Sequence, residues 1–294
     1  MFVRARKMHA DEVDHDVPLV HRLIATQFPQ WADLPVEPFD SSGTDNAIYR
    51  LGQDMAVRLP RRGTAGDKDL RWLPRLAPLL PVPVPVPLGE GRPAEGYPFS
   101  WSVFGWLDGV NPSPETLTAP ELLTKDLAEF VTAFRRIDLP DGPPGYRGGP
   151  LSLLDAPMRI ALDDSRGLVD TDAVTAAWEA DLKTPEWAGP PVWIHADLMP
   201  GNLLVVQGRL SAVIDFGTVG VGDPSCDLIV AWNLLPAAVR DDFRAALQVD
   251  DATWARGRGR ALAIALIALP YYLNTNPVFA ANARHVINEV LADH

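Results

Sequence analysis

The sequence contains a single cysteine, Cys226, among its 294 residues. A lone cysteine cannot close a disulfide within the chain, so nothing in the sequence indicates an oxidising compartment. The metal and nucleophile motifs C-x-x-C, H-E-x-x-H and G-x-S-x-G are absent, and the histidines show no metal-ligand spacing. We therefore expect Cys226 to be a small buried residue.

Long hydrophobic runs are also absent. The longest, ALAIALIALP at Ala261–Pro270, is too short to span a bilayer and predicts a buried helix. The first residues, MFVRARKMHADEVDHD, include basic side chains but no apolar segment after them, unlike a secretory signal. We therefore expect a cytoplasmic protein with no membrane partner.

Basic residues are in short supply. Lys and Arg number 26 against 38 Asp and Glu, which gives a net charge of −12. Such a protein repels phosphate backbones, so a nucleic-acid partner is not expected. The excess of acid is uneven, because residues 1–100 carry a net charge of −1 and residues 101–294 carry −11.

The hydrophobic spacing predicts a change of character along the chain. A helix is expected over Asp16–Phe28, with Asp16 as its cap, and the expected elements of the following region are strands at Val36–Phe39, Ala47–Leu51, Met55–Leu59 and Phe99–Leu107, a helix at Asp67–Leu76 and an extended or edge segment at Pro81–Pro87. A helix begins at Pro120, and Asp138–Pro150 is a Gly/Pro-rich loop. Further helices are expected near 155–165, 171–181, 225–234, 238–247, 253–268 and 278–292, with short strands at Val192–Ile194, Leu203–Val206 and Ala212–Ile214.

This order predicts an α+β fold with two lobes. A small antiparallel sheet lobe over residues 1–105 precedes a larger, mainly helical lobe over residues 106–294. The overall length and the 47% hydrophobic content suit two lobes that share a cleft.

The most informative segment is VWIHADLMPGNLLVVQGRLSAVIDFGTVGVGDPSCDL, residues 192–228. In it, His195-Ala-Asp197 is followed by Asn202, then by two apolar strands, and then by Asp215-Phe-Gly. Both strands are apolar and hence expected to be buried, so the three polar side chains should emerge at one edge. The thirteen positions from Asn202 to Asp215 suit two short strands and a turn.

These residue types match the needs of phosphoryl transfer from a nucleotide. One carboxylate must orient the attacking hydroxyl, oxygen ligands must hold Mg²⁺, and a cation or backbone donors must hold the phosphates. Asp197 suits the first task, and Asn202 with Asp215 suits the second. His195 is expected to have a packing and hydrogen-bonding role rather than to transfer protons.

The pair of segments HADLMPGN and VIDFGTVGVGDPSCDL resembles the aminoglycoside phosphotransferase family of antibiotic kinases, and SSGTDNAIYRLGQDMAVRLP is similar to that family's nucleotide loop and following strand. The resemblance covers most of the chain and implies a bilobal protein-kinase-like fold. It also implies Asp197 as the catalytic carboxylate, Asn202 and Asp215 as Mg²⁺ ligands, and Asp227 as an acid that braces the catalytic loop. The implied nucleotide site has Ser42, Gly43, Thr44, Asp45 and Asn46 over the triphosphate of ATP or GTP, and Phe104–Leu107, with Phe104 and Trp106, as the hinge that stacks on the purine.

The chain departs from the family pattern at the phosphate-binding lysine. Arg58 stands at that position in the strand after the hairpin, and Asp69 best matches the expected acidic partner. An Arg–Asp pair keeps the charge complementarity of a Lys–Glu pair, and arginine can bind phosphate bidentately. The nucleotide loop is also poor in glycine, with Gly43 alone inside it.

Two features bear on the acceptor. Eight acids lie between Leu151 and Trp187 and would attract a polycation such as an aminoglycoside, although they could equally solubilise a helical face. Alternatively, the aromatics of the last part of the chain would line a pocket for a larger and less charged acceptor such as a macrolide; they are Trp232, Trp254, Tyr271 and Tyr272.

The leading hypothesis is a magnesium-dependent kinase that phosphorylates a hydroxyl of a small, cationic acceptor, with an aminoglycoside first among the candidates. A macrolide kinase, a metabolic kinase for a sugar, amino alcohol or homoserine, and an inactive nucleotide-binding pseudokinase are the alternatives. A protein kinase is disfavoured, because the five residues between Gly217 and Asp223 leave no room for an activation segment. The protein could be a monomer or a dimer.

Overall fold

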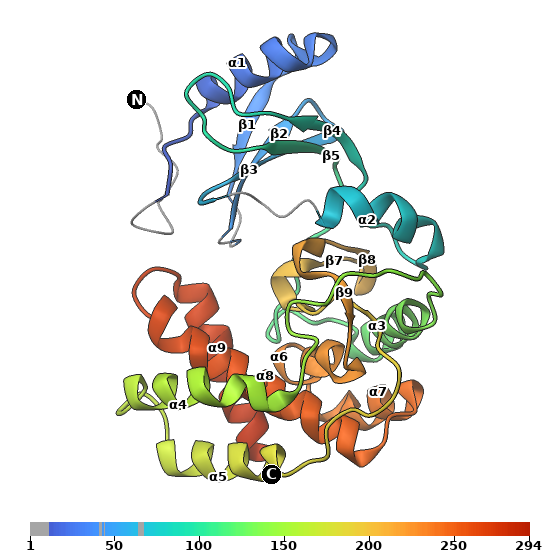
Figure 1. The fold of residues 1–294 in the computed structure, drawn as a ribbon, viewed down its shortest axis with the longest axis vertical. Helices are drawn as coiled ribbons and strands as arrows, with labels where there is room; N and C mark the ends of the chain where they lie inside the picture. The colour runs from blue at the N-terminus through green and yellow to red at the C-terminus, as the bar shows by residue number, and fades with distance from the viewer. Residues whose placement is uncertain (1–11, 41–42, 44, 64–67) are drawn as a thin grey trace. The chain divides into compact units, whose positions relative to one another are not determined.

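The computed structural model describes residues 12–40, 43, 45–63 and 68–294. By its internal contacts the chain forms two compact units. The first runs to Pro78 and includes Val84–Asp108, and the second comprises Leu79–Pro83 and Gly109–His294. Figure 1 traces both units. The division of the chain into a lobe over residues 1–105 and a lobe over residues 106–294 stays a prediction.

The first unit is built on a five-stranded antiparallel sheet. Its strand order is β1 (Val36–Phe39), β2 (Asn46–Leu51), β3 (Met55–Pro60), β5 (Trp101–Gly105) and β4 (Pro87–Gly91). The strands at 36–39, 47–51 and 55–59 are therefore confirmed within one residue. The segment before Pro87 is not in the sheet, and β4 lies at the sheet edge, where proline's missing N–H is tolerated.

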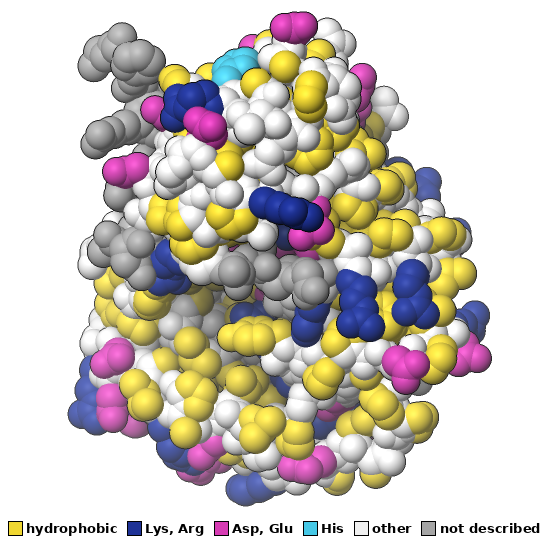
Figure 2. Space-filling model, turned by 45° about the horizontal axis from the view of Figure 1, so that its top comes forward, with side chains coloured by type: hydrophobic (Ala, Val, Ile, Leu, Met, Phe, Trp, Pro, Cys, Tyr) yellow, Lys and Arg dark blue, Asp and Glu magenta, His cyan; other side chains and the backbone are white. Residues whose placement is uncertain are grey.

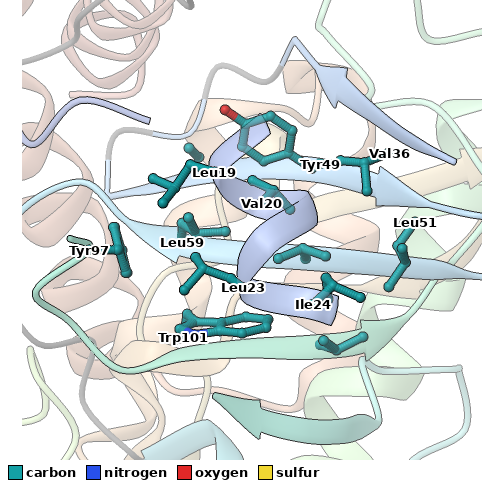
Figure 3. Packing of buried hydrophobic residues seen from close by; sticks show 13 residues of the cluster. Leu19, Val20, Leu23, Ile24, Val36, Tyr49, Leu51, Leu59, Tyr97 and Trp101 are labelled. Atoms are coloured by element: carbon teal, nitrogen blue, oxygen red, sulfur yellow. The ribbon is translucent and has the colours of Figure 1, made fainter. Parts of the chain in front are cut away.

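Helix α1 (Val17–Gln27) covers one face of this sheet. It begins as predicted at Asp16, whose Oδ1 accepts a hydrogen bond from the Leu19 amide at 2.8 Å. The four apolar side chains of its buried stripe pack on the strands, as Figure 3 shows; they are Leu19, Val20, Leu23 and Ile24. Because side chains alternate along a strand, Val57 and Leu59 of β3 join this core and Arg58 projects from the opposite face.

Helix α2 (Lys68–Leu76) follows β3 and completes the first unit. The predicted helix began at Asp67, which lies outside the described residues. Its buried residues include the apolar Trp72, Leu73 and Leu76 together with the charged Asp69. A fully buried carboxylate on this helix is expected to have a charged partner, and the site below supplies one.

The second unit is mainly helical. Its helices are α3 (Pro120–Arg135), α4 (Asp155–Asp164), α5 (Thr171–Leu182), α6 (Val230–Asn233), α7 (Arg240–Leu247), α8 (Asp251–Tyr272) and α9 (Pro277–Ala292). Two small antiparallel ribbons accompany them, β6 (Val192–Ile194) with β9 (Gly220–Gly222) and β7 (Leu203–Val206) with β8 (Arg209–Val213). The predicted α+β class with a sheet unit and a helical unit is confirmed.

Two predicted elements of the second unit need correction, and one strand was not predicted. The helix over 225–234 is wrong as one α-helix, because Pro224–Ile229 is a 3-10 helix and α6 follows it. The 3-10 helix places the Asp227 side chain against the amides of His195 and Ala196. Strand β9 is missing from the prediction because its sequence, Gly-Val-Gly, has no strand signal. The strand expected at 212–214 begins earlier, at Arg209.

The apolar run at Ala261–Pro270 lies inside α8, and most of its side chains are buried, as predicted. Helix α8 contacts α9 and the 3-10 helix Pro224–Ile229, so it forms the centre of the second unit. In the described part of the chain, no helix combines the length and apolar character needed to cross a membrane.

The Gly/Pro-rich loop 138–150 is pinned along β9 by backbone hydrogen bonds. The Val221 amide donates to Pro143 O at 2.8 Å, and the Gly145 amide donates to Val221 O at 3.0 Å. A Cβ added to Gly222 would lie 2.5 Å from the Gly148 Cα, closer than Cβ atoms approach backbone in proteins. Glycine in β9 therefore lets the two backbone segments touch.

This packing predicts that Gly222→Ala destabilises the protein. The added methyl group meets backbone atoms that cannot rotate away, so the free energy of unfolding should fall by about 1–3 kcal/mol. Gly105→Ala is the control, because its Cβ would meet nothing within 4 Å and the change should stay within about 0.5 kcal/mol. Urea unfolding of both variants tests this, and equal stability of the two would contradict it.

Candidate active site

The segment after β6 places Asp197 by means of a buried carboxylate. Asp227, fully buried, accepts hydrogen bonds from the amides of His195 at 2.9 Å and Ala196 at 2.8 Å. Ala196 has φ of 67°, a left-handed conformation that is uncommon for a residue with a side chain. Burial raises the pKa of Asp227, and its interactions with His195 and the two amides oppose that effect.

Asn202 joins Asp197 through its side chain. Its Nδ2 donates to both the main-chain O and the Oδ2 of Asp197, each at 2.9 Å. The intervening 3-10 turn, Pro200–Asn202, is closed by the Asn202 amide on Met199 O at 2.9 Å. Asn111 braces this turn from outside, with its Nδ2 at 2.9 Å from Gly201 O and 2.8 Å from Leu203 O.

Asp215 lies directly beyond the residue that pairs with Asn202. The Ile214 amide donates to Asn202 O at 2.9 Å, and the β7–β8 hairpin between them has the predicted form. Asp215 is exposed and also left-handed, with φ of 62°. The structure therefore brings Asp197 and Asn202 into contact and positions the Asp215 segment beside them, as the spacing predicted.

The buried His195 side chain contacts the segment around Asp215. Its Nε2 lies 3.1 Å from Ile214 O, which can only accept, so Nε2 carries the proton. The imidazole packs edge-on against the Phe216 ring at 4.6 Å, and Thr218 Oγ1 donates to His195 O at 2.8 Å. These contacts agree with the predicted packing and hydrogen-bonding role of this buried histidine.

A basic residue that the sequence analysis missed pairs with the central acid. Arg147, from the loop 138–150, forms an ion pair with Asp197 through Nη1 and Oδ1. The same Nη1 lies 3.4 Å from Ala196 O. No motif marks this arginine, because it stands 50 positions away in a loop whose only sequence signal is its glycine and proline content.

The D-P-x-x-D segment is buried and tied to α8. Asp223 accepts from Arg256 Nε at 2.8 Å and from Arg260 Nη2 at 3.2 Å. Burial alone would raise the pKa of Asp223, but hydrogen bonds from Arg256 and the Ser225 amide outweigh it and hold the pKa below its ordinary value. Cys226 is buried as predicted, and burial raises the pKa of its thiol to about 12.

In the first unit, Arg58 and Asp69 form the ion pair that the sequence analysis expected. The Arg58 Nη2 contacts Asp69 Oδ2, and the guanidinium carbon lies 5.0 Å from the Phe104 ring centroid. Phe104 is itself buried in β5. Trp106 packs against Arg50, whose guanidinium carbon lies 4.3 Å from the ring centroid.

The expected nucleotide loop is described in part. Gly43 and Asp45 are exposed, and Asn46 begins β2. Ser42 and Thr44 lie outside the described residues. The roles of these positions toward a triphosphate stay predictions.

Most of the acids between Leu151 and Trp187 have partners in their own part of the fold. Five have partners: Asp155 with Arg159 and Trp178, Asp163 with Arg166, Asp170 as the cap of α5, Asp181 with Arg258 and His294, and Glu186 with Ser152. On the face drawn in Figure 2, acidic side chains are interspersed with Lys and Arg. These acids therefore do not by themselves identify a polycation site.

The alternative aromatic pocket needs correction. Trp232 is fully buried, packs against Trp254 at 4.7 Å between ring centroids, and donates from Nε1 to Asp293 Oδ2 at 3.1 Å. Trp254 is also buried, at 8% exposure. The two tryptophans therefore belong to the core, whereas Tyr271 is 56% exposed and Tyr272 is half-buried, so only the two tyrosines of this set reach the surface.

Comparison with known proteins identifies the family. The model of the phosphotransferase enzyme family APH matches residues 36–262, well over half of the chain. The chain belongs to this family. This match confirms the family resemblance that the motifs indicated.

Individual relatives match over shorter stretches or at low identity. An aminoglycoside 3'-phosphotransferase of Escherichia coli is 34% identical over 91 residues, which is 28% of this chain and 32% of that protein. The chain thus aligns with about a third of the length of this curated relative. The structure of APH(2")-IIIa with GDP and kanamycin has a TM-score of 0.75 at 19% identity, covering 94% of this chain and 99% of that one. Macrolide 2'-phosphotransferase MphH of Brachybacterium faecium has a TM-score of 0.59 at 22% identity, covering 92% and 97%. These structures share the fold.

The site predicts that Asp227→Asn loosens the segment that carries Asp197. Asparagine offers one acceptor oxygen where the carboxylate offers two, so one of the amides of His195 and Ala196 loses its partner in the interior. We expect the free energy of unfolding to fall by about 2–3 kcal/mol in urea titrations. Asp241→Asn, at an exposed position of α7, is the matched control and should change stability by less than about 0.5 kcal/mol. A similar small change in both variants would contradict the bracing role of Asp227.

Proposed function

We propose that this protein is a small-molecule kinase that transfers the terminal phosphate of ATP or GTP to a hydroxyl of an aminoglycoside. The observation that carries the proposal is the joined arrangement of Asp197, Asn202 and the Asp215 segment in a member of the phosphotransferase family. Such an arrangement meets the needs of phosphoryl transfer, in which positioning and charge stabilisation supply most of the catalysis.

Asp197 is the proposed catalytic carboxylate. A hydroxyl that donates a hydrogen bond to it is oriented toward the phosphate and gives up its proton as the new O–P bond forms. Asp197 is a quarter exposed, so a bound acceptor can reach it. The contacts to Asn202 and the bracing of the preceding amides by Asp227 hold the carboxylate in place before the acceptor arrives.

Mg²⁺ would be held by Asn202 and Asp215. The residues fit this ion, because Asn202 commits its Nδ2 to Asp197 and keeps the amide oxygen as its ligand atom, and Asp215 is an exposed carboxylate. Within the described ranges, no group of three or more His, Cys, Asp or Glu could hold a metal alone. This agrees with an ion that takes its other ligands from phosphates and water, and when bound it would neutralise phosphate charge.

The first unit supplies the proposed nucleotide contacts. Arg58, fixed by the buried Asp69, would bind phosphate oxygens, and the segment Ser42–Asn46 would lie over the triphosphate. Of the two hinge residues, the half-buried Trp106 would stack on the purine, whereas Phe104, at 4% exposure, is too buried to do so. An arginine that is already oriented loses less side-chain entropy on binding than a free lysine would, so we propose that Arg58 replaces the lysine in function.

An aminoglycoside is the proposed acceptor because two kinds of similarity agree. The relative from Escherichia coli named above is an aminoglycoside 3'-phosphotransferase, and APH(2")-IIIa was solved with kanamycin. A further neighbour was solved with gentamicin. The net charge of −12 favours a cationic acceptor over an anionic one.

The proposal is tested by mass spectrometry of reactions containing the protein, Mg²⁺, ATP or GTP, and a panel of aminoglycosides, macrolides and cyclic peptide antibiotics. One phosphate added to an aminoglycoside supports the proposal. Phosphate added to a macrolide alone, or to nothing while nucleotide still binds by calorimetry, contradicts it.

The same assay predicts the outcome of Asp197→Ala. Without the carboxylate the hydroxyl is neither oriented nor deprotonated, so turnover should fall at least about a hundredfold, whereas nucleotide affinity should change less than about threefold. Asp33→Ala, at an exposed position of the first unit, should behave as the unaltered protein. Activity that survives Asp197→Ala would show that another residue is the catalytic carboxylate.

A further inference from the structure

The two carboxylate oxygens of Asp197 are held by two different residues. Asn202 Nδ2 contacts Oδ2 at 2.9 Å, and Arg147 Nη1 contacts Oδ1. A single contact would leave the carboxylate able to turn about its Cβ–Cγ bond, whereas contacts at both oxygens fix its plane. The side chains of Arg147 and Asp197 are each 25% exposed, so solvent reaches the pair.

Arg147 is itself fixed through its backbone. Its carbonyl oxygen accepts from Arg260 Nη1 at 2.7 Å and from Cys226 Sγ at 3.0 Å. The next carbonyl, of Gly148, accepts from the Asp223 amide at 3.0 Å. The loop has no helix or strand of its own at this point, so these bonds determine where the Arg147 side chain starts.

Arg260 is an unusual residue for the interior, because it is 1% exposed. Its guanidinium is bonded on all sides: Nε donates to Ser225 Oγ at 2.9 Å, Nη2 lies 3.2 Å from Asp223 Oδ2, and Nη2 also donates to Gly149 O. A buried ion pair of this kind adds little net stability over an apolar core. Its geometric effect is specific, since it joins α8 to the loop that carries Arg147.

Building on the proposed function, we propose that Arg147 is a positioning residue that holds the Asp197 carboxylate in the orientation for phosphoryl transfer, and that Arg260 acts through Arg147. The planar guanidinium keeps one carboxylate oxygen in place while the acceptor hydroxyl approaches. Arg147 thus affects the rate of transfer rather than the binding of nucleotide or acceptor.

The test compares Arg147→Met and Arg147→Lys with the unaltered protein, using the acceptor found by mass spectrometry. We measure kcat and KM for nucleotide and acceptor, the single-turnover rate, and the rate of nucleotide hydrolysis by water. Arg147→Met should lower kcat and the single-turnover rate about 10- to 100-fold with each KM within about twofold, because small misplacements of catalytic groups have effects of this size. Arg147→Lys should recover part of the loss, since lysine can still contact Oδ1.

The matched control is Arg22→Met. Arg22 forms an ion pair with Glu95 at 3.4 Å in the first unit and is about half exposed, so it resembles Arg147 in charge and pairing but not in location. Its removal should leave kcat and KM unchanged. Thermal unfolding of each variant confirms that the comparison is between folded proteins.

A double-variant cycle tests the part played by Arg260. As a single substitution, Arg260→Lys should lower kcat. Added to Arg147→Met, it should lower kcat little further, because Arg260 acts through Arg147. Fully additive losses would overturn this part of the proposal.

The outcomes separate this proposal from the proposed function. If the unaltered protein phosphorylates its acceptor and Arg147→Met leaves kcat unchanged, Arg147 does not position Asp197. If Arg147→Met raises only the KM of the acceptor, the arginine binds acceptor, which also overturns the proposal. If the unaltered protein transfers phosphate neither to an acceptor nor to water, the proposed function itself fails.

Discussion

The hydrogen bonds from the amides of His195 and Ala196 to the buried Asp227 carboxylate are the contact on which the site depends. They stabilise a left-handed residue immediately before Asp197 and therefore set the direction in which the Asp197 side chain leaves the backbone. Burial disfavours the charged form of this carboxylate and raises its pKa, and the two amide hydrogen bonds, together with His195 and Arg135, oppose that effect. The bond from the Asn202 side chain to Asp197, and through Ile214 the placement of Asp215, build on that starting direction.

A second layer of interactions joins this segment to the helical core. The loop 138–150 lies along β9, where glycine permits backbone contact, and α8 holds both from behind through Arg256 and Arg260. The loop segments that carry Asp197 and Arg147 are thereby joined to the helical core. Catalytic loops need such support, because they have little internal structure to hold a side chain within the tolerance of phosphoryl transfer.

The features that depend on a few neighbouring residues could be predicted from the sequence. The cap of α1, the three strands that begin the sheet and the hairpin between Asn202 and Asp215 follow from periodicity and spacing over a few residues. The pairing of Arg58 with Asp69 followed from the resemblance to the family, whose lysine and acidic partner these two residues match in position. The roles proposed for these residues come from the resemblance to the family.

The rest depends on contacts between distant segments, which no local pattern encodes. Arg147 reaches Asp197 from 50 positions away, and β9 forms only because the loop 138–150 and β6 lie on either side of it. The sequence cannot tell a tryptophan in the core from a tryptophan in a pocket. Only the packing of Trp232 against Trp254 in the structure assigns them to the core. The partners of the acids in 151–187 likewise could not be read from the sequence, because they lie in distant segments or across helices.

The measurement that tests the central claim most directly is a crystal structure of the protein with Mg²⁺, a non-hydrolysable purine triphosphate analogue and kanamycin. The account predicts an acceptor hydroxyl within hydrogen-bond reach of the Asp197 carboxylate, about 2.6–3.2 Å, and a metal ion bound by the Asn202 side-chain oxygen and Asp215. An acceptor hydroxyl held by a different side chain, or a metal ion bound elsewhere, would contradict it.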